Sequence, residues 1–233
     1  MTSELNTNRS NGISSGNAAI IAGIALLIMS IVAPIANFSI LQKLFVPGDA
    51  AKTFSNIVAS EGSFRLAIGL FLVVAILDII VAWALYVFLK PVNNSLSLLT
   101  AWFRIIYATM LGSVLIYLVN VLLLINDPGY LSALSTTQIH AQVMSLIGTF
   151  SHGWEFGLII FGVHLLLLGY LMFKAGYMRK ILGILIILAS LGYMIDGLGR
   201  LLSTQYNISI SMFTFIGEVV LIFWLLIKGR KIQ

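Results

Sequence analysis

Residues 66–94 read LAIGLFLVVAILDIIVAWALYVFLKPVNN, and this stretch decides the fold class. Between residues 66 and 89 the only charged side chain is Asp78. A bilayer core about 30 Å thick is crossed by about 20 apolar residues in a helix. The PVNN sequence then indicates a tight turn, and a second long apolar run follows it. The stretch therefore predicts an antiparallel pair of membrane-spanning helices.

Similar apolar runs recur along the chain, so the fold class is all-α: a polytopic membrane protein with a six-helix bundle. The predicted spans are 18–41, 63–89, 97–124, 146–173, 181–202 and 208–227. Pro34 is expected to kink the first span. Two further helices are expected outside the hydrocarbon, one after Pro47 and one that begins near Ser135 and continues into the fourth span. The predicted domains are a flexible polar tail (1–17), a membrane domain (18–228) and a basic end (229–233).

The composition excludes several classes of protein. The chain is 60% hydrophobic and only 9% charged, which rules out a soluble enzyme, a disordered protein and a nucleic-acid-binding domain. The absence of cysteine excludes disulfides and thiolate metal sites. The lipid bilayer is the expected partner, no cofactor and no nucleic acid are expected, and a homo-oligomer remains open.

The basic residues predict the orientation. Cytoplasmic loops of membrane proteins are enriched in Lys and Arg. With the N-terminus inside, the outer loops hold only Lys43 and Lys52. The inner segments then hold eight: Arg9, Lys90, Lys174, Arg179, Lys180, Lys228, Arg230 and Lys231. Both termini are therefore predicted to be cytoplasmic.

Charged residues inside the spans are the candidate functional residues, because charge at bilayer depth is costly and often marks function. One group is predicted in the outer half: Arg65, His152, Glu155, Asp196, Arg200 and Glu218. Its functional interpretation is a water-filled cavity, open to the outside, that binds a cation or a small polar ligand. The alternative is a set of salt bridges, Arg200 with Asp196 or Glu155 and Arg65 with Glu61.

A metal site in this layer is not expected. His152, Glu155 and Asp196 could supply ligands, with Glu218 as another oxygen donor. His164 is twelve residues from His152, about 18 Å along a helix, and cannot join them. The usual catalytic signatures, such as H-E-x-x-H and G-x-S-x-G, are absent, so no catalytic residue is assigned.

A second, deeper group is expected across the hairpin. Asp78 and Arg104 lie at similar distances from its turn, and Tyr107 follows Arg104 by about one helical turn. These three residues predict a buried network that clamps the second and third spans together. The alternative is proton coupling through Asp78.

Several motifs resemble those of a bacterial multi-pass membrane family catalogued as a domain of unknown function. They are Phe64-Arg65, Trp83-Ala84-Leu85-Tyr86, Pro91-Val92-Asn93, Trp102-Phe103-Arg104, Phe161-Gly162-Val163-His164-Leu165, Gly169-Tyr170-Leu171, Leu182-Gly183 and Gly192-Tyr193-Met194-Ile195-Asp196. The resemblance implies a six-helix core in the bacterial cytoplasmic membrane and carries no activity.

Three functions therefore compete. The first is transport or ligand sensing through the outward-facing cavity. The second is an intramembrane metal-dependent hydrolase that uses His152, Glu155 and Asp196 or Glu218. The third is an accessory subunit whose charges only hold the bundle together.

Overall fold

The computed structural model describes residues 12–203 and 205–232, and every regular element in these ranges is helical. Five helices are long and apolar enough to cross a membrane: α1 with its continuation (Ser15–Leu44), α4 (Glu61–Leu89), α5 (Asn94–Asn126), α7 (Thr136–Lys174) and α8 (Lys180–Leu202). The shorter elements are η1 (Ile35–Leu41), α2 (Gln42–Leu44), α3 (Ala50–Ala59), α6 (Pro128–Ala133), α9 (Ser211–Thr214), α10 (Ile216–Ile227) and η2 (Gly229–Lys231). The predicted all-α membrane fold is confirmed.

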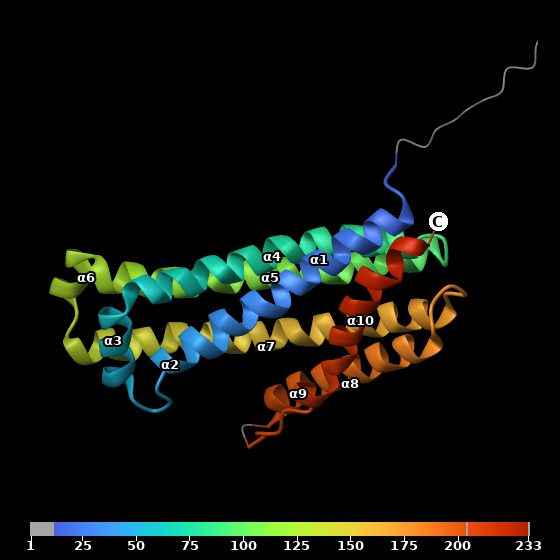
Figure 1. The fold of residues 1–233 in the computed structure, drawn as a ribbon. Coiled ribbons are helices and arrows are strands. Elements are labelled where there is room, and N and C mark those ends of the chain that lie inside the picture. The colour runs from blue at the N-terminus through green and yellow to red at the C-terminus, as the bar shows by residue number, and fades with distance from the viewer. Residues whose placement is uncertain (1–11, 204, 233) are drawn as a thin grey trace, which may run out of the picture.

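The predicted sixth span differs from the other five. Helix α9 begins only at Ser211, and a turn at Phe215 separates it from α10. The whole stretch Ser211–Ile227 is shorter than a typical span, so length and composition give five spans in the described ranges. Figure 1 shows α10 crossing obliquely in the half of the bundle that carries the C-terminus.

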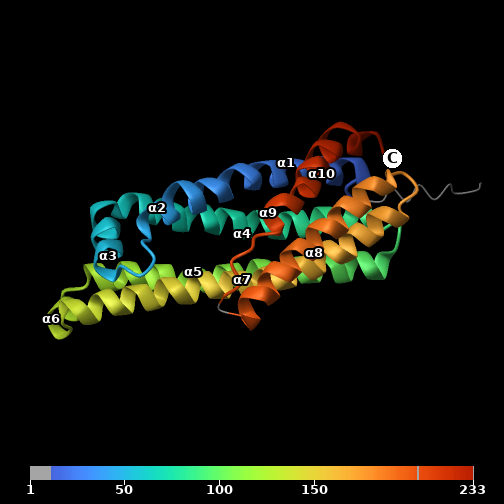
Figure 2. The same ribbon diagram turned by 90° about the horizontal axis from the view of Figure 1, so that it is seen from below.

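The helices form a closed ring. Helix α1 packs on α4, α4 on α5, α5 on α7, α7 on α8, α8 on α10, and α10 returns to α1. Figures 1 and 2 show that α7 runs far beyond the end of α8. This mismatch follows from their lengths, 39 and 23 residues, or about 58 and 35 Å. One face of α7 is therefore left uncovered by α8.

Two apolar cores fill the ring. One lies toward the termini and includes Leu85, Phe88, Leu168 and Leu225. The other lies at the far end, where Phe64, Phe71, Leu118 and Phe150 pack with Ile57 of α3. On α4, Asp78 falls between the residues of the two cores, so the buried charge lies where the cores meet.

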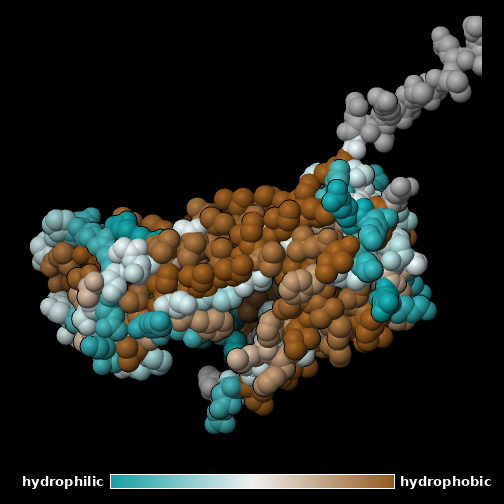
Figure 3. Space-filling model, viewed as in Figure 1, coloured by the Kyte–Doolittle hydropathy of each residue, from teal (hydrophilic) through white to brown (hydrophobic). Residues whose placement is uncertain are grey.

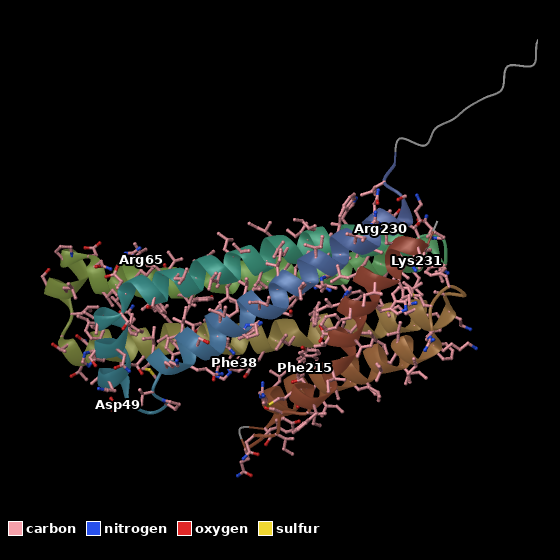
Figure 4. The ribbon with its side chains drawn as sticks, in the orientation of Figure 1. Phe38, Asp49, Arg65, Phe215, Arg230 and Lys231 are labelled. Atoms are coloured by element: carbon pink, nitrogen blue, oxygen red, sulfur yellow. The ribbon has the colours of Figure 1, made fainter. Side chains whose placement is uncertain are left out.

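The surface matches a protein embedded in a bilayer. Figure 3 shows a broad hydrophobic band between two hydrophilic ends. Asp49 and Arg65 lie toward one end, whereas Arg230 and Lys231 lie at the other (Figure 4). The start of α1 is also at the second end, because Gly16 lies against the backbone of Arg230 and Ile232. The first and last described residues are therefore on the same side of the bundle.

Local sequence explains the helix boundaries. Asn93 caps α5 by accepting from Leu96 N at 2.9 Å, which fixes the hairpin turn after α4. Ser135 and Gln138 form a capping box, so α7 begins at Thr136, well before the apolar span predicted from residue 146. The disturbance expected at Pro34 takes the form of the π-helical stretch η1 directly after it. Helix α1 begins at Ser15, and residues 1–11 of the predicted tail lie outside the described residues.

Candidate functional site

The site that the sequence predicts in the outer half (the outer-half site) lies where α7 passes the end of α8. Arg200 Nη1 donates to Glu155 Oε1 at 3.2 Å, and His152 Nδ1 lies 3.6 Å from Glu155 Oε2. These groups are not sealed: the side chains of Glu155 and Arg200 are 29% and 30% exposed. A cavity of about 230 Å³ is lined by His152, Glu155, Phe156, Gly197, Arg200 and Leu201. The site therefore combines a negative and a positive group within reach of a small molecule.

A larger groove adjoins this cavity and shares three of its lining residues, His152, Phe156 and Leu201. It has a volume of about 570 Å³ and runs along the face of α7 that α8 leaves uncovered. Its other lining residues are Val114, Tyr117, Ser145, Gly148, Thr149 and Gly153. A Cβ atom at Gly148 would meet no atom within 4 Å, so this part of the groove is open.

Asp196 lies close to this site but does not line it. Its Oδ1 accepts from the Tyr206 hydroxyl at 2.8 Å and from Ile210 N at 2.9 Å. Its Oδ2 accepts from Ser211 N at 2.8 Å and from Ser211 Oγ at 2.6 Å. The carboxylate thus holds the loop after α8 and the start of α9, and its acceptor positions are already used.

Arg200 links the two regions, because its Nη2 donates to Ser209 Oγ at 3.1 Å while its Nη1 binds Glu155. Of the two pairings considered from the sequence, the structure therefore shows Arg200 with Glu155. Arg65 (Figure 4) pairs with Glu61 at 2.6 Å in the first two turns of α4, and neither residue lines the cavity or the groove.

The deeper site is a buried polar cluster on three helices. Arg104 Nη2 of α5 lies 2.6 Å from Asp78 Oδ1 of α4, and both side chains are almost completely buried. Arg104 Nη1 is 3.2 Å from Nε2 of His164 on α7, whose Nδ1 is 2.8 Å from the Thr100 carbonyl oxygen. The guanidinium also lies 5.3 Å from the centre of the Phe161 ring, in cation–π range. The structure thus brings Asp78 and Arg104 together and adds His164.

Tyr107 borders this cluster without a hydrogen bond to Asp78. The Trp154 indole donates to the Tyr107 hydroxyl at 3.2 Å, and the Tyr107 ring lies 4.9 Å from that of Phe161. In place of a bond within the predicted Asp78–Arg104–Tyr107 network, Tyr107 thus makes a contact between α5 and α7. The physical reason is that the hydroxyl of Tyr107 finds the Trp154 donor on the neighbouring helix.

Glu218 belongs with this deeper cluster and not with the outer groove. It does not line either cavity, and it interacts electrostatically with Arg104, Asp78 and the Tyr193 side chain. Its position reflects the short α10, which places Glu218 near mid-bundle. The outer layer of six residues inferred from the sequence therefore reduces to His152, Glu155 and Arg200 at the cavity.

Comparison with known proteins places the chain in a family. Residues 21–229 match the family described as a domain of unknown function, DUF4386. The chain belongs to this family. An uncharacterized protein of the archaeon Archaeoglobus fulgidus is 42% identical over 166 residues, which is 71% of this chain and 85% of that protein. The chain thus has a relative in an archaeon, whereas the sequence motifs resembled those of a bacterial family. No solved structure matches the chain.

The metal alternative finds no ligand set in the described residues of this DUF4386 protein. No group of three or more His, Cys, Asp or Glu side chains within 12–203 and 205–232 is arranged to hold a metal ion. His152 and Glu155 lie together, but Asp196 faces the loop that it caps.

Sequence reasoning missed three residues of these sites: Tyr206, Ser209 and Trp154. Tyr206 and Ser209 lie in an irregular loop, for which helical periodicity predicts no neighbours. For Trp154 the available signal was its indole N–H, since a buried indole needs an acceptor.

Proposed function

We propose that this DUF4386 protein binds a small polar ligand at the outer-half cavity, as a step in transport or sensing. The observation that supports the proposal is the partly exposed pair Glu155–Arg200 beside a cavity of about 230 Å³. The Asp78–Arg104 pair, which links two helices, is almost completely buried and out of reach of a ligand. The outer pair instead stays accessible.

The chemistry of the cavity favours a zwitterionic ligand. A guanidinium recognises a carboxylate or phosphate with two parallel hydrogen bonds, and a carboxylate binds an ammonium group. Arg200 and Glu155 offer both within one cavity, and the exposed His152 adds a donor or acceptor. The adjoining groove has room for an apolar part of the same molecule.

The test is a binding survey with the purified protein in detergent micelles. The probes are phosphocholine, glycine betaine, L-amino acids, choline chloride and sodium phosphate, and the readouts are thermal stabilisation and titration calorimetry. We expect a zwitterion to bind more tightly than either single ion. Glu155→Gln and Arg200→Gln should each weaken binding by tenfold or more, whereas Glu61→Gln, at an exposed pair away from the cavity, should leave it unchanged. Binding that is equal in all variants would place the ligand elsewhere, and no binding by any probe would favour the accessory-subunit alternative.

We further propose six crossings of the plasma membrane, with Ser211–Ile227 as a short sixth crossing and both termini cytoplasmic. The common side of the two ends and the basic residues Arg230 and Lys231 there support this orientation. The chain has no cysteine, so single-cysteine variants can be labelled without background. Ala51→Cys in α3 should react with a membrane-impermeant maleimide in intact cells, and Gly176→Cys in the α7–α8 turn should react only after lysis. The opposite pattern would invert the topology.

A further inference from the structure

The deeper cluster contains unused hydrogen-bonding capacity. Within residues 12–203 and 205–232, the buried side-chain atoms without a hydrogen-bond partner are Asp78 Oδ1 and Oδ2, Arg104 Nε and Glu218 Oε1. Asp78 Oδ1 is in the ion pair with Arg104, but the other three atoms make no hydrogen bond in the structure. Native proteins rarely leave buried polar atoms unpartnered, so such atoms in one place need an explanation. Here all of them belong to three side chains that interact electrostatically with one another.

Hydrogen-bond geometry fixes the charge of His164. The Thr100 carbonyl can only accept, so His164 Nδ1 donates to it. The Arg104 guanidinium can only donate, so His164 Nε2 accepts from it. His164 is therefore the neutral imidazole and adds no charge to the cluster.

The remaining charges do not balance. Arg104 supplies one positive charge, and Asp78, at 2.6 Å, neutralises it. An ionised Glu218 would leave the cluster with one uncompensated negative charge in the middle of an apolar bundle, which is strongly unfavourable. The backbone N–H of Glu218 itself is not available to stabilise it, because it already donates to Phe215 O at 2.9 Å.

We propose that this cluster binds one exchangeable proton, carried by Glu218. The proton removes the excess charge and turns the Glu218 carboxyl into a donor as well as an acceptor. Asp78 stays ionised because it directly contacts Arg104. As a residue Glu218 is only partly buried, although its Oε1 atom is inaccessible.

Among the described residues, the other groups that interact with Glu218 do not supply the missing positive charge. The groups that interact with it are Tyr193 of α8, Tyr107 of α5, and the Asp78–Arg104 pair. Helix α1, which also packs on α10, carries no titratable side chain between Ser15 and Pro34. The basic residues of η2 lie at the end of the bundle (Figure 4).

The experiment is infrared spectroscopy of the full protein in lipid vesicles at neutral pH, in H₂O and D₂O. A protonated carboxyl gives a C=O stretching band that shifts on deuteration. We expect the wild type to show this band and Glu218→Gln to lose it, while the control Glu61→Gln keeps it. Asp78→Asn should also lose it, because Arg104 then neutralises Glu218. This second variant tests the charge count even where Glu218→Gln fails to fold.

Three results would overturn the proposal. The first is a wild-type spectrum without the band. The second is a band that persists in Glu218→Gln, which would assign the proton to another carboxyl. The third is a band that is absent in sodium chloride but appears in N-methylglucamine chloride, which would make a sodium ion the occupant. None of these results depends on the outer-half ligand, so this test and that of the proposed function fail separately.

Discussion

Replacement of the Asp78–Arg104 pair tests how α4 and α5, the two helices of the hairpin, are held together. Arg104→Met keeps most of the side-chain volume but leaves Asp78 without its positive partner at a position that is almost fully buried. Asp78→Leu leaves the guanidinium without its carboxylate. Removal of one partner of a buried ion pair costs about 3–5 kcal/mol, because the other charge remains desolvated.

The double variant Asp78→Leu/Arg104→Met should be far more stable than the sum of the single variants predicts. Replacement of a buried pair by apolar residues of similar volume is often neutral or stabilising. The hydrogen bond from Arg104 to His164 is also lost, which costs about 1 kcal/mol. The two single losses sum to about 6–10 kcal/mol, so the coupling energy should be about 5 kcal/mol or more.

The assay is equilibrium unfolding in mixed micelles with increasing dodecyl sulfate, followed by the fluorescence of the four tryptophans. The matched surface cycle uses Glu61→Leu and Arg65→Met, because that pair has the same charges at 2.6 Å but is exposed. Its coupling energy should stay below about 1 kcal/mol. Additive effects of the Asp78 and Arg104 replacements would refute the reasoning, since they would mean that the buried pair carries no mutual stabilisation.

Three further predictions concern the ends of the helices. Asp196→Ala removes the acceptors for the backbone N–H groups of Ile210 and Ser211, so amide hydrogen exchange in the loop before α9 should become faster and the free energy of unfolding should fall by about 1–2 kcal/mol. Unchanged exchange in residues 205–214 would count against a capping role for Asp196. Gly183→Ala should destabilise the α7–α8 contact, because its Cβ would lie 2.6 Å from Gly169 O, whereas Gly176→Ala, which meets open space, should have no such effect on thermal unfolding. Burial raises the pKa of Tyr177 from 10.0 to about 12, so the tyrosine ionises first in the unfolded protein, and the free energy of unfolding should fall as pH rises between these values. The Tyr177→Phe variant should lose stability less steeply over this pH range, and an identical pH dependence would contradict the prediction.

The helical parts of the fold could be predicted because they depend on local signals. Apolar length located the first five spans, and the PVNN turn predicted the α4–α5 hairpin. The amphipathic pattern after residue 135 predicted a helix that begins near Ser135 and continues into the fourth span, and α7 with its capping box confirms this helix start. The sixth segment was overestimated because its apolar composition continues through residues 208–210, which are not helical, and through the break at Phe215. Composition measures hydropathy, not whether the backbone stays helical.

The depth predicted for a side chain depends on which end of its helix the residues are counted from. Asp78 lies 11 residues before the last residue of α4, Leu89. Arg104 lies 10 residues after the first residue of α5, Asn94. His164 is 10 residues from Lys174, and Glu218 is 9 from Ile227. At 1.5 Å per residue these four residues fall within about 3 Å of one depth. The sequence analysis grouped Glu218 with Glu155 and Asp196 because it counted residues from the opposite ends of the helices. Those ends are not level, since α10 is short and α7 is long, so similar counts correspond to different depths in the bundle.

The common inner depth has a physical consequence for how the bundle works. At the end of the bundle that carries the termini, the helices are tied by short turns and by the contact between α1 and η2, so distances counted from that end are well defined. At the opposite end, α7 extends well beyond α8. This leaves the face of α7 uncovered where the groove lies. Charge placed at the common inner depth meets across the ring and becomes buried, whereas charge near the end of the shorter α8 stays accessible to a ligand. The difference in length between α7 and α8 therefore separates the accessible Glu155–Arg200 pair from the buried Asp78–Arg104–Glu218 cluster.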